Sequence, residues 1–213
     1  MSLSIVRKFV PDSYVPTVYD VDYNQFYDNG IRYAIFDVDD TILPADDTLV
    51  TPKLSRLFDY VQKDIGIDTC LVSNGSKSRV KPVAESLHVS YVANAFKPLP
   101  RAFTTVQSFF GEQDISSNTA FIGDSVFLDM LFADRFRMYK VLVDSIRENR
   151  WNFKTVSNDI VQAVMTIPLK HEGFEFGRHY GKKIAKISYF YFEYNMHNIL
   201  LRLNFHHEFV WLP

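Results

Sequence analysis

From residue 31 onward, short apolar runs alternate with segments in which apolar residues recur at helical spacing. The run Tyr33–Val38 (YAIFDV) is rich in β-branched and aromatic residues and has the length of a buried strand. In the next segment Thr51 suits an N-cap and Pro52 suits the first position of a helix. The same analysis predicts further strands over 69–72, 89–93, 120–122 and 139–143, and helices over 51–61, 78–87, 100–110 and 126–132.

Strands and helices that alternate in this way predict an α/β fold, with a parallel sheet covered by helices on both faces. Residues 1–30 are rich in Tyr and Asp and are expected to form an irregular arm with one short helix. We therefore expect an N-terminal arm over 1–30, a catalytic core over 31–150 and a C-terminal extension over 151–213.

Composition narrows the class of protein. The chain has 213 residues, of which 47% are hydrophobic and 23% charged, so it can bury a core. The net charge of −2 gives no reason to expect nucleic acid as a partner, and the single cysteine, Cys70, excludes a disulfide framework. No signal peptide or run of about 18 apolar residues is visible, so we expect a cytoplasmic protein.

The C-terminal extension has an unusual composition. Residues 170–213 contain 11 aromatic residues, mixed with basic residues such as Lys182, Lys183 and Arg202. An amphipathic segment of this kind can lie on an anionic membrane, with aromatic rings at the depth of the headgroups. The same residues can instead be buried against the core or against another subunit. Both interpretations remain open, as does the oligomeric state.

Polar residues follow the predicted strands. Asp37 and Asp39 follow the first strand, and Asp124 follows the strand over 120–122. Because ligands bind at the carboxyl ends of parallel strands, we expect these carboxylates to lie close together. They would repel one another unless a cation lay between them, and an all-oxygen donor set favours Mg²⁺.

Groups that suit a phosphate follow two other strands. Ser73 stands before a predicted helix, where backbone N–H groups attract anions. Lys97 follows the strand over 89–93 and supplies a positive charge. Together with the aspartates, these residues predict phosphoryl transfer through an aspartyl-phosphate.

In this order and spacing, the motifs DxDxT (37–41), Ser-Asn (73–74), Lys-Pro (97–98) and GDSxxxD (123–129) resemble those of the haloacid dehalogenase (HAD) superfamily. The runs DVDDTILP, SNGSKSRVKPVAESL and NAFKPLPRAF are similar to the YqeG-type phosphatases of its subfamily IIIA. That family is similar to phosphatases that act on phosphatidylglycerophosphate. The resemblance covers roughly residues 10–150 and implies a HAD-like, Rossmann-type fold.

The resemblance also implies roles for residues of this chain. Asp37 would be the nucleophile and Asp39 the general acid and base. Thr41 would support the loop that carries them, whereas Ser73 and Lys97 would hold the phosphate.

The same resemblance implies a magnesium cofactor. Asp37, the backbone of Asp39, and Asp124 would bind Mg²⁺, and Asp129 would support the metal through water. The chain departs from the usual pattern of the family it resembles, which has Asn in place of Asp40, Gln in place of Ser125 and an Asn-Arg pair in place of Asp134-Arg135. None of these departures removes a catalytic group.

On the substrate side, Asn74 belongs to the Ser-Asn motif and is expected to contact substrate. Arg79 and Arg101 match basic positions of the family and would either contact substrate or lie on helix surfaces. The connections around Ser73 are too short for an inserted cap domain, so we expect an open site.

An open site suits a substrate whose bulk stays outside the protein, and with the family resemblance this favours phosphatidylglycerophosphate, hydrolysed by an enzyme at the membrane surface. Phosphoproteins, nucleic-acid ends and soluble metabolites remain alternatives, as does a scaffold that binds a phosphorylated ligand without turnover.

Overall fold

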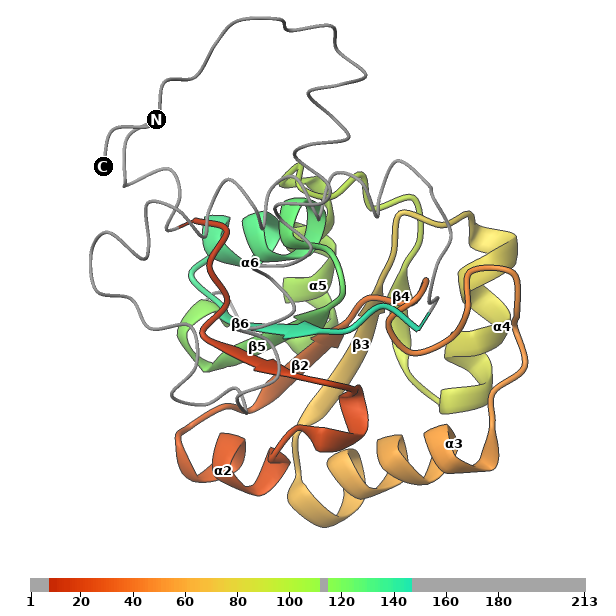
Figure 1. Cartoon of the computed structure of the whole chain (residues 1–213), viewed down its shortest axis with the longest axis horizontal. Helices are drawn as coiled ribbons and strands as arrows, with labels where there is room; N and C mark the ends of the chain where they lie inside the picture. Colours follow the sequence, from red (N-terminus) through yellow and green to blue (C-terminus); the bar gives the residue numbers. More distant parts are fainter. Residues whose placement is uncertain (1–7, 112–114, 147–213) are drawn as a thin grey trace, which may run out of the picture. The chain divides into compact units, whose positions relative to one another are not determined.

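The computed structural model describes residues 8–111 and 115–146. Its centre is a six-stranded sheet in the order β1-β6-β5-β2-β3-β4, in which every neighbouring pair is parallel (Figure 1). This order places β2 at the centre, with β3 and β5 on its two sides. The strands are β1 (Ser13–Val15), β2 (Tyr33–Phe36), β3 (Asp68–Val72), β4 (Ser90–Val92), β5 (Thr119–Gly123) and β6 (Tyr139–Val143).

Helices connect the strands and begin near the positions that the sequence predicts. The Thr51 side chain accepts a hydrogen bond from the backbone N–H of Leu54 at 3.2 Å, which caps α3 as expected. Beyond α3 the chain continues as a π-helical turn, Tyr60–Ile65, and ends at Gly66 in the left-handed conformation. The α-helices are α2 (Tyr23–Asp28), α3 (Pro52–Asp59), α4 (Lys77–Leu87), α5 (Arg101–Phe110) and α6 (Leu131–Arg135), with a second π-helical turn at Val126–Met130 and 3₁₀ turns at Val18–Asp20 and Ser116–Asn118.

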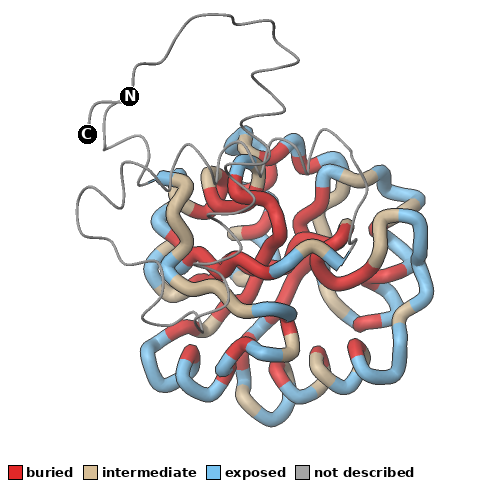
Figure 2. Tube along the Cα trace, viewed as in Figure 1, coloured by how far each residue is buried: buried red, intermediate tan, exposed pale blue. Residues whose placement is uncertain are grey.

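Alternating side chains of the central strand face two separate apolar cores. Ala34 and Phe36 of β2 belong to the cluster that also includes buried residues of α2, α3 and α4. Tyr33 and Ile35 belong to the opposite cluster, with buried residues of α5 and α6. Figure 2 shows the sheet buried between these layers, which confirms the predicted α/β fold with both faces covered.

The N-terminal segment contributes more than the sequence predicts. β1 pairs with β6 in register, with Ser13 opposite Val141, and extends the sheet by one strand. In α2, Tyr23 and Phe26 are buried in the core. The sequence predicts the short helix but an otherwise irregular arm, because three residues between Asp12 and Pro16 are too few to show a strand pattern. Pairing with β6 supplies the stabilisation that the local sequence lacks.

The connections that could carry a cap domain are short. Between β2 and β3 the chain forms a loop, α3 and the π-helical turn, and between Ser73 and Lys97 it forms α4 and β4. All of these residues are described, and within them the structure holds no inserted domain, in agreement with the predicted open site.

The predicted C-terminal extension, 151–213, lies outside the described residues, and so do both interpretations of its aromatic segment. In the part of the chain that is described, no helix has the length and apolar character needed to span a bilayer.

We predict that the N-terminal segment is part of the folding unit. The ring of Phe26 lies 5.4 Å from that of Tyr139 in β6, so Phe26→Ala should lower the free energy of unfolding by about 3–5 kcal/mol. Phe109→Ala, at an exposed position near the end of α5, should cost less than about 1 kcal/mol. Urea denaturation measures both. Equal losses would show that residues 23–28 do not stabilise the sheet.

Candidate active site

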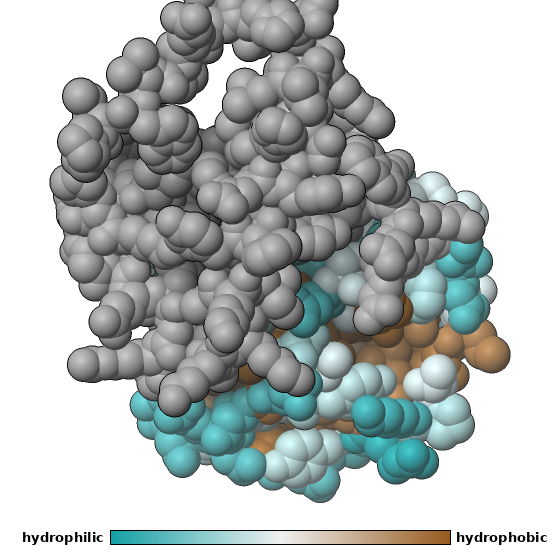
Figure 3. All heavy atoms as spheres, viewed as in Figure 1, coloured by the Kyte–Doolittle hydropathy of each residue, from teal (hydrophilic) through white to brown (hydrophobic). Residues whose placement is uncertain are grey.

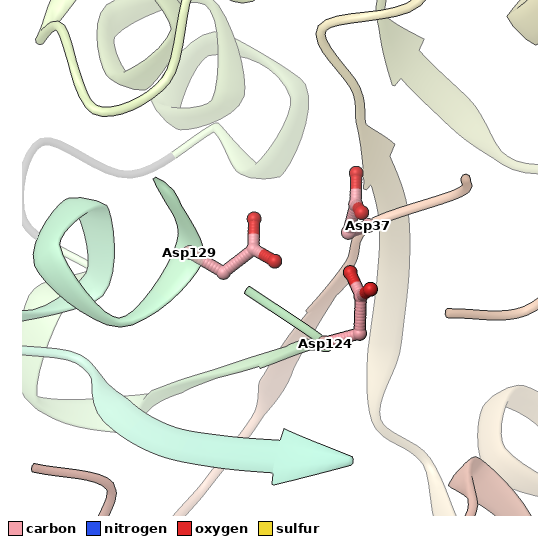
Figure 4. Close-up of side chains that lie close together, drawn as sticks. All are labelled: Asp37, Asp124 and Asp129. Carbon is pink, nitrogen blue, oxygen red and sulfur yellow. The ribbon is translucent and has the colours of Figure 1, made fainter. Parts of the chain in front are cut away.

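Three carboxylates converge where β2 and β5 end. The backbone N–H of Asp37 donates to the carbonyl of Ile122 at 2.9 Å, so the ladder between these strands continues past Phe36. Continued by one residue, this register sets Asp37 opposite Gly123, next to Asp124, and Asp129 comes from the π-helical turn after β5. Figure 4 shows the three side chains gathered around one point, and one oxygen of each lies within 4.8 Å of the others. All three are buried.

Lys97 joins two of these carboxylates. Its Nζ donates to Oδ1 of Asp37 and to Oδ1 of Asp129, both at 2.7 Å. Burial alone would lower the pKa of Lys97, but the charges of Asp129 and Asp37 outweigh burial and raise the pKa above its ordinary value. Lys97 therefore remains a cation inside the protein.

Thr41 links the loop after β2 to β5. Its hydroxyl lies 3.3 Å from Oδ2 of Asp37 and 3.2 Å from Oδ1 of Asp124, and it accepts from the backbone N–H of Asp124 at 3.1 Å. A hydroxyl has one proton, so Thr41 donates to one of the two carboxylates at a time. These contacts join the ends of the two strands.

Asp39 occupies a separate, more exposed position. The hydroxyl of Ser73 donates to Oδ2 of Asp39 at 3.2 Å, and Nε of Arg79 donates to Oδ1 at 3.1 Å. Nη2 of Arg79 binds the carbonyl of Pro44 at 3.0 Å, whereas Nη1 is buried with no hydrogen-bond partner. Arg79 thus fixes Asp39 and retains a donor for another acceptor.

The remaining predicted site residues differ in position. The amide of Asn74 accepts from the backbone N–H of Lys97 at 2.6 Å and donates to its carbonyl at 3.2 Å. These contacts hold the Lys97 backbone, whereas the sequence predicts a substrate contact for Asn74. Arg101 is exposed at the start of α5, and within the described residues no contact joins its guanidinium to the carboxylates.

Three further residues shape the site. Asp40 has a φ of 65°, which Asp tolerates better than most residues, and its Oδ1 accepts from the backbone N–H of Ala45 at 3.1 Å. A Cβ on Gly75 would lie 2.9 Å from Oδ2 of Asp39, and one on Gly123 would lie 2.7 Å from Cβ of Asp129. The GDSxxxD motif contains Gly123, but the sequence alone does not reveal this close approach.

The donor set fits a divalent metal. Three buried carboxylates offer only oxygen ligands, and these are the hard donors that Mg²⁺ prefers. The side chain of Asp39 does not belong to this cluster. If Asp39 binds the metal as predicted, it would do so through its backbone.

Comparison with known proteins agrees with the geometry. The family model described as mitochondrial PGP phosphatase matches residues 2–146. This chain belongs to that family. It is also similar to a probable phosphatase, YqeG, of Bacillus subtilis, with 27% identity over 165 residues that cover 78% of this chain and 94% of the relative. The chain is therefore a phosphatase, a phosphoric monoester hydrolase.

Three solved structures with a similar fold have lower sequence identity to this chain than YqeG has. A hypothetical protein of Xanthomonas campestris matches with 15% identity and a TM-score of 0.42, covering 82% of this chain and 98% of that one. The 3-deoxy-D-manno-octulosonate 8-phosphate phosphatase of Moraxella catarrhalis matches with 19% identity and a TM-score of 0.41, covering 69% and 91%. A probable YrbI-family phosphatase of Pseudomonas syringae matches with 12% identity and a TM-score of 0.39, covering 74% and 99%.

The close packing of Gly123 generates a prediction for activity. In Gly123→Ala the new methyl group must displace Asp129 and disturb its contact with Lys97, so kcat for an aryl phosphate should fall by about a hundredfold. Gly30→Ala is the control, because Gly30 has a φ of 88° and no atom within 4 Å of the added Cβ. It should lower the melting temperature but leave kcat within about twofold of the parent. A Gly123→Ala enzyme with parental kcat would contradict the role of this packing.

Proposed function

We propose that this chain hydrolyses the terminal phosphate of phosphatidylglycerophosphate through an aspartyl-phosphate on Asp37. The observation that carries the proposal is the buried cluster of Asp37, Lys97, Asp124 and Asp129, with Asp39 held beside it by Ser73 and Arg79. A nucleophile, a fixed cation and a separately held carboxyl group are the parts that a two-step phosphate transfer needs.

In the first step an oxygen of Asp37 attacks phosphorus, and the bond between phosphorus and the ester oxygen breaks. Asp39 gives its proton to the departing alcohol. In the second step a water attacks phosphorus, Asp39 takes a proton from that water, and the bond to Asp37 breaks to release inorganic phosphate. Asp37, Asp124 and Asp129 would hold Mg²⁺, which supplies positive charge to the phosphoryl oxygens when bound.

The residues around Asp37 would divide the remaining work. Lys97 neutralises charge on the phosphoryl group as it develops, and it does so inside the protein, where charges interact strongly. The Ser73 hydroxyl, which donates to Asp39 in this structure, would donate to a phosphoryl oxygen of the bound substrate instead. The unpaired Nη1 of Arg79 offers a further donor to the substrate. Asp39 must carry a proton when it acts as the acid, and the partial exposure of its side chain gives it access to water.

The choice of substrate rests on the family and on the open site. The matched family is named for PGP phosphatase activity, and a site without an inserted cap domain leaves room for a headgroup whose lipid remains in a membrane. Small soluble substrates are more often enclosed by a lid that excludes water.

The first test concerns the nucleophile. Asp37→Asn removes the attacking carboxylate and should lower the Mg²⁺-dependent hydrolysis of an aryl phosphate by about a thousandfold. Asp47→Asn is the matched control, because Asp47 is exposed in the same loop and its carboxylate accepts only a local backbone hydrogen bond from Leu49 among its described contacts. It should retain the parental rate. If Asp37→Asn also retains it, another residue attacks phosphorus. A parent with no Mg²⁺-dependent turnover would favour the scaffold alternative.

The second test concerns the substrate. Phosphate release should have a much higher kcat/KM on phosphatidylglycerophosphate in anionic vesicles than on phosphopeptides, 5′-phosphorylated oligonucleotides or sugar phosphates. The same preparations of Asp37→Asn give the background in each assay. If a soluble phosphate is cleaved with the higher kcat/KM, the lipid assignment fails, whereas the assignment of Asp37 as nucleophile stands on the first test.

A further inference from the structure

The most exposed large apolar side chains gather at the catalytic end of the sheet. Among the described residues, five such side chains are more than 40% exposed, and each follows the carboxyl end of a strand. The other exposed examples, which are 37–39% exposed, lie at the opposite end, in late turns of helices or at the start of β6. The five are Leu49 (73%), Phe96 (56%), Leu99 (55%), Ile146 (45%) and Phe127 (43%).

Two of the five lie beside the catalytic lysine. In the sequence Phe96-Lys97-Pro98-Leu99, Lys97 is 4% exposed and points to the carboxylates, whereas Phe96 and Leu99 on either side of it face solvent. The loop between β4 and α5 therefore presents a cation to the pocket and two apolar groups to the outside. When the phosphate of a substrate binds at Lys97, the part of the substrate that remains outside the site would lie near Phe96 and Leu99.

The conformation of Phe96 is unusual for an exposed aromatic residue. Its φ of 53° lies in the left-handed region, which costs a bulky residue about 1–2 kcal/mol. The ring is more than half exposed, so its burial does not offset this cost. Glycine or asparagine would fit the same backbone more easily. Packing in the folded core does not account for an exposed phenylalanine in this conformation, whereas a contact outside the core would.

The charged residues in this loop and in the segment 73–83 are all basic, whereas Asp46, Asp47 and Asp144 are exposed after β2 and β6. Lys77 and Arg101 are exposed at the first turns of α4 and α5, the helices that follow β3 and β4. The segments 73–83 and 94–101 contain no Asp or Glu. Figure 3 shows that the described surface carries hydrophobic residues among hydrophilic ones. Exposed apolar side chains flanked by cations are complementary to the surface of an anionic bilayer. The apolar side chains can contact the acyl chains, and the cations can contact the lipid phosphates.

We propose that Phe96, Leu99, Lys77 and Arg101 form a membrane-docking surface, which inserts Phe96 and Leu99 into an anionic bilayer. This inference rests on the proposed lipid substrate and adds the residues that bring the pocket to it. The membrane is favoured over a protein partner because two exposed apolar side chains lie in the loop that carries Lys97 and exposed cations lie at the starts of α4 and α5, a combination that an anionic lipid surface complements.

The test measures binding without turnover. The full-length chain is floated with phosphatidylcholine vesicles that contain or lack phosphatidylglycerol, which carries no hydrolysable terminal phosphate. Phe96→Asn suits the left-handed backbone and should weaken binding to the anionic vesicles about tenfold, and Leu99→Gln should act similarly. Phe109→Asn is the matched control at the opposite end of the sheet and should bind like the parent.

Charge is tested with the same vesicles. Lys77→Gln should weaken binding about fivefold when phosphatidylglycerol is present, but should have no effect when it is absent. Equal binding by Phe96→Asn and Phe109→Asn would overturn the proposal, as would a parent that does not float. Either result would indicate that this surface binds a protein partner or residues 147–213 and not a membrane. Hydrolysis of a soluble aryl phosphate, measured separately, reports whether the proposed chemistry holds.

Discussion

The bond between Lys97 and the two carboxylates of Asp37 and Asp129 determines how the rest of the site is built. An ammonium group removed from water costs several kcal/mol unless it is paired in good geometry, and here it has two contacts at 2.7 Å. Its partners come from the end of β2 and from the turn after β5, while Lys97 itself follows β4. One buried cation thus joins the segments that follow three strands. Each of these strands must therefore end at the residue that brings its side chain to the cluster.

Several other features serve this arrangement. Asn74 binds both backbone groups of Lys97, so the end of β3 fixes the loop that follows β4. Gly123 leaves room for Asp129 to approach β5, and the backbone N–H of Ser125 donates to Oδ2 of Asp129 at 2.9 Å. With Lys97 turned inward, its neighbours in the loop turn outward, and Phe96 then faces solvent. Catalysis and the proposed docking surface therefore depend on the same loop.

The sequence is informative about this site because parallel strands bring distant motifs to one edge. It predicts that Asp37 and Asp124 lie near each other, since both follow buried strands. It does not reveal β1, whose pairing with β6 joins residues more than a hundred positions apart. It also leaves open the contact of Arg79 with Asp39, because a residue on the first turns of a helix can point to the pocket or to solvent. Such choices are made by tertiary packing and not by local pattern.

The departures from the family pattern can be understood in the same terms. Asp40 keeps a left-handed backbone and accepts a hydrogen bond from Ala45, and Asn could meet both requirements. The Ser125 hydroxyl accepts from the backbone N–H of Leu128 and caps the π-helical turn that carries Asp129. Asp134 pairs with Lys140 at the start of β6, away from the strand ends. These residues shape or brace the fold, so differences there do not by themselves argue for a different substrate.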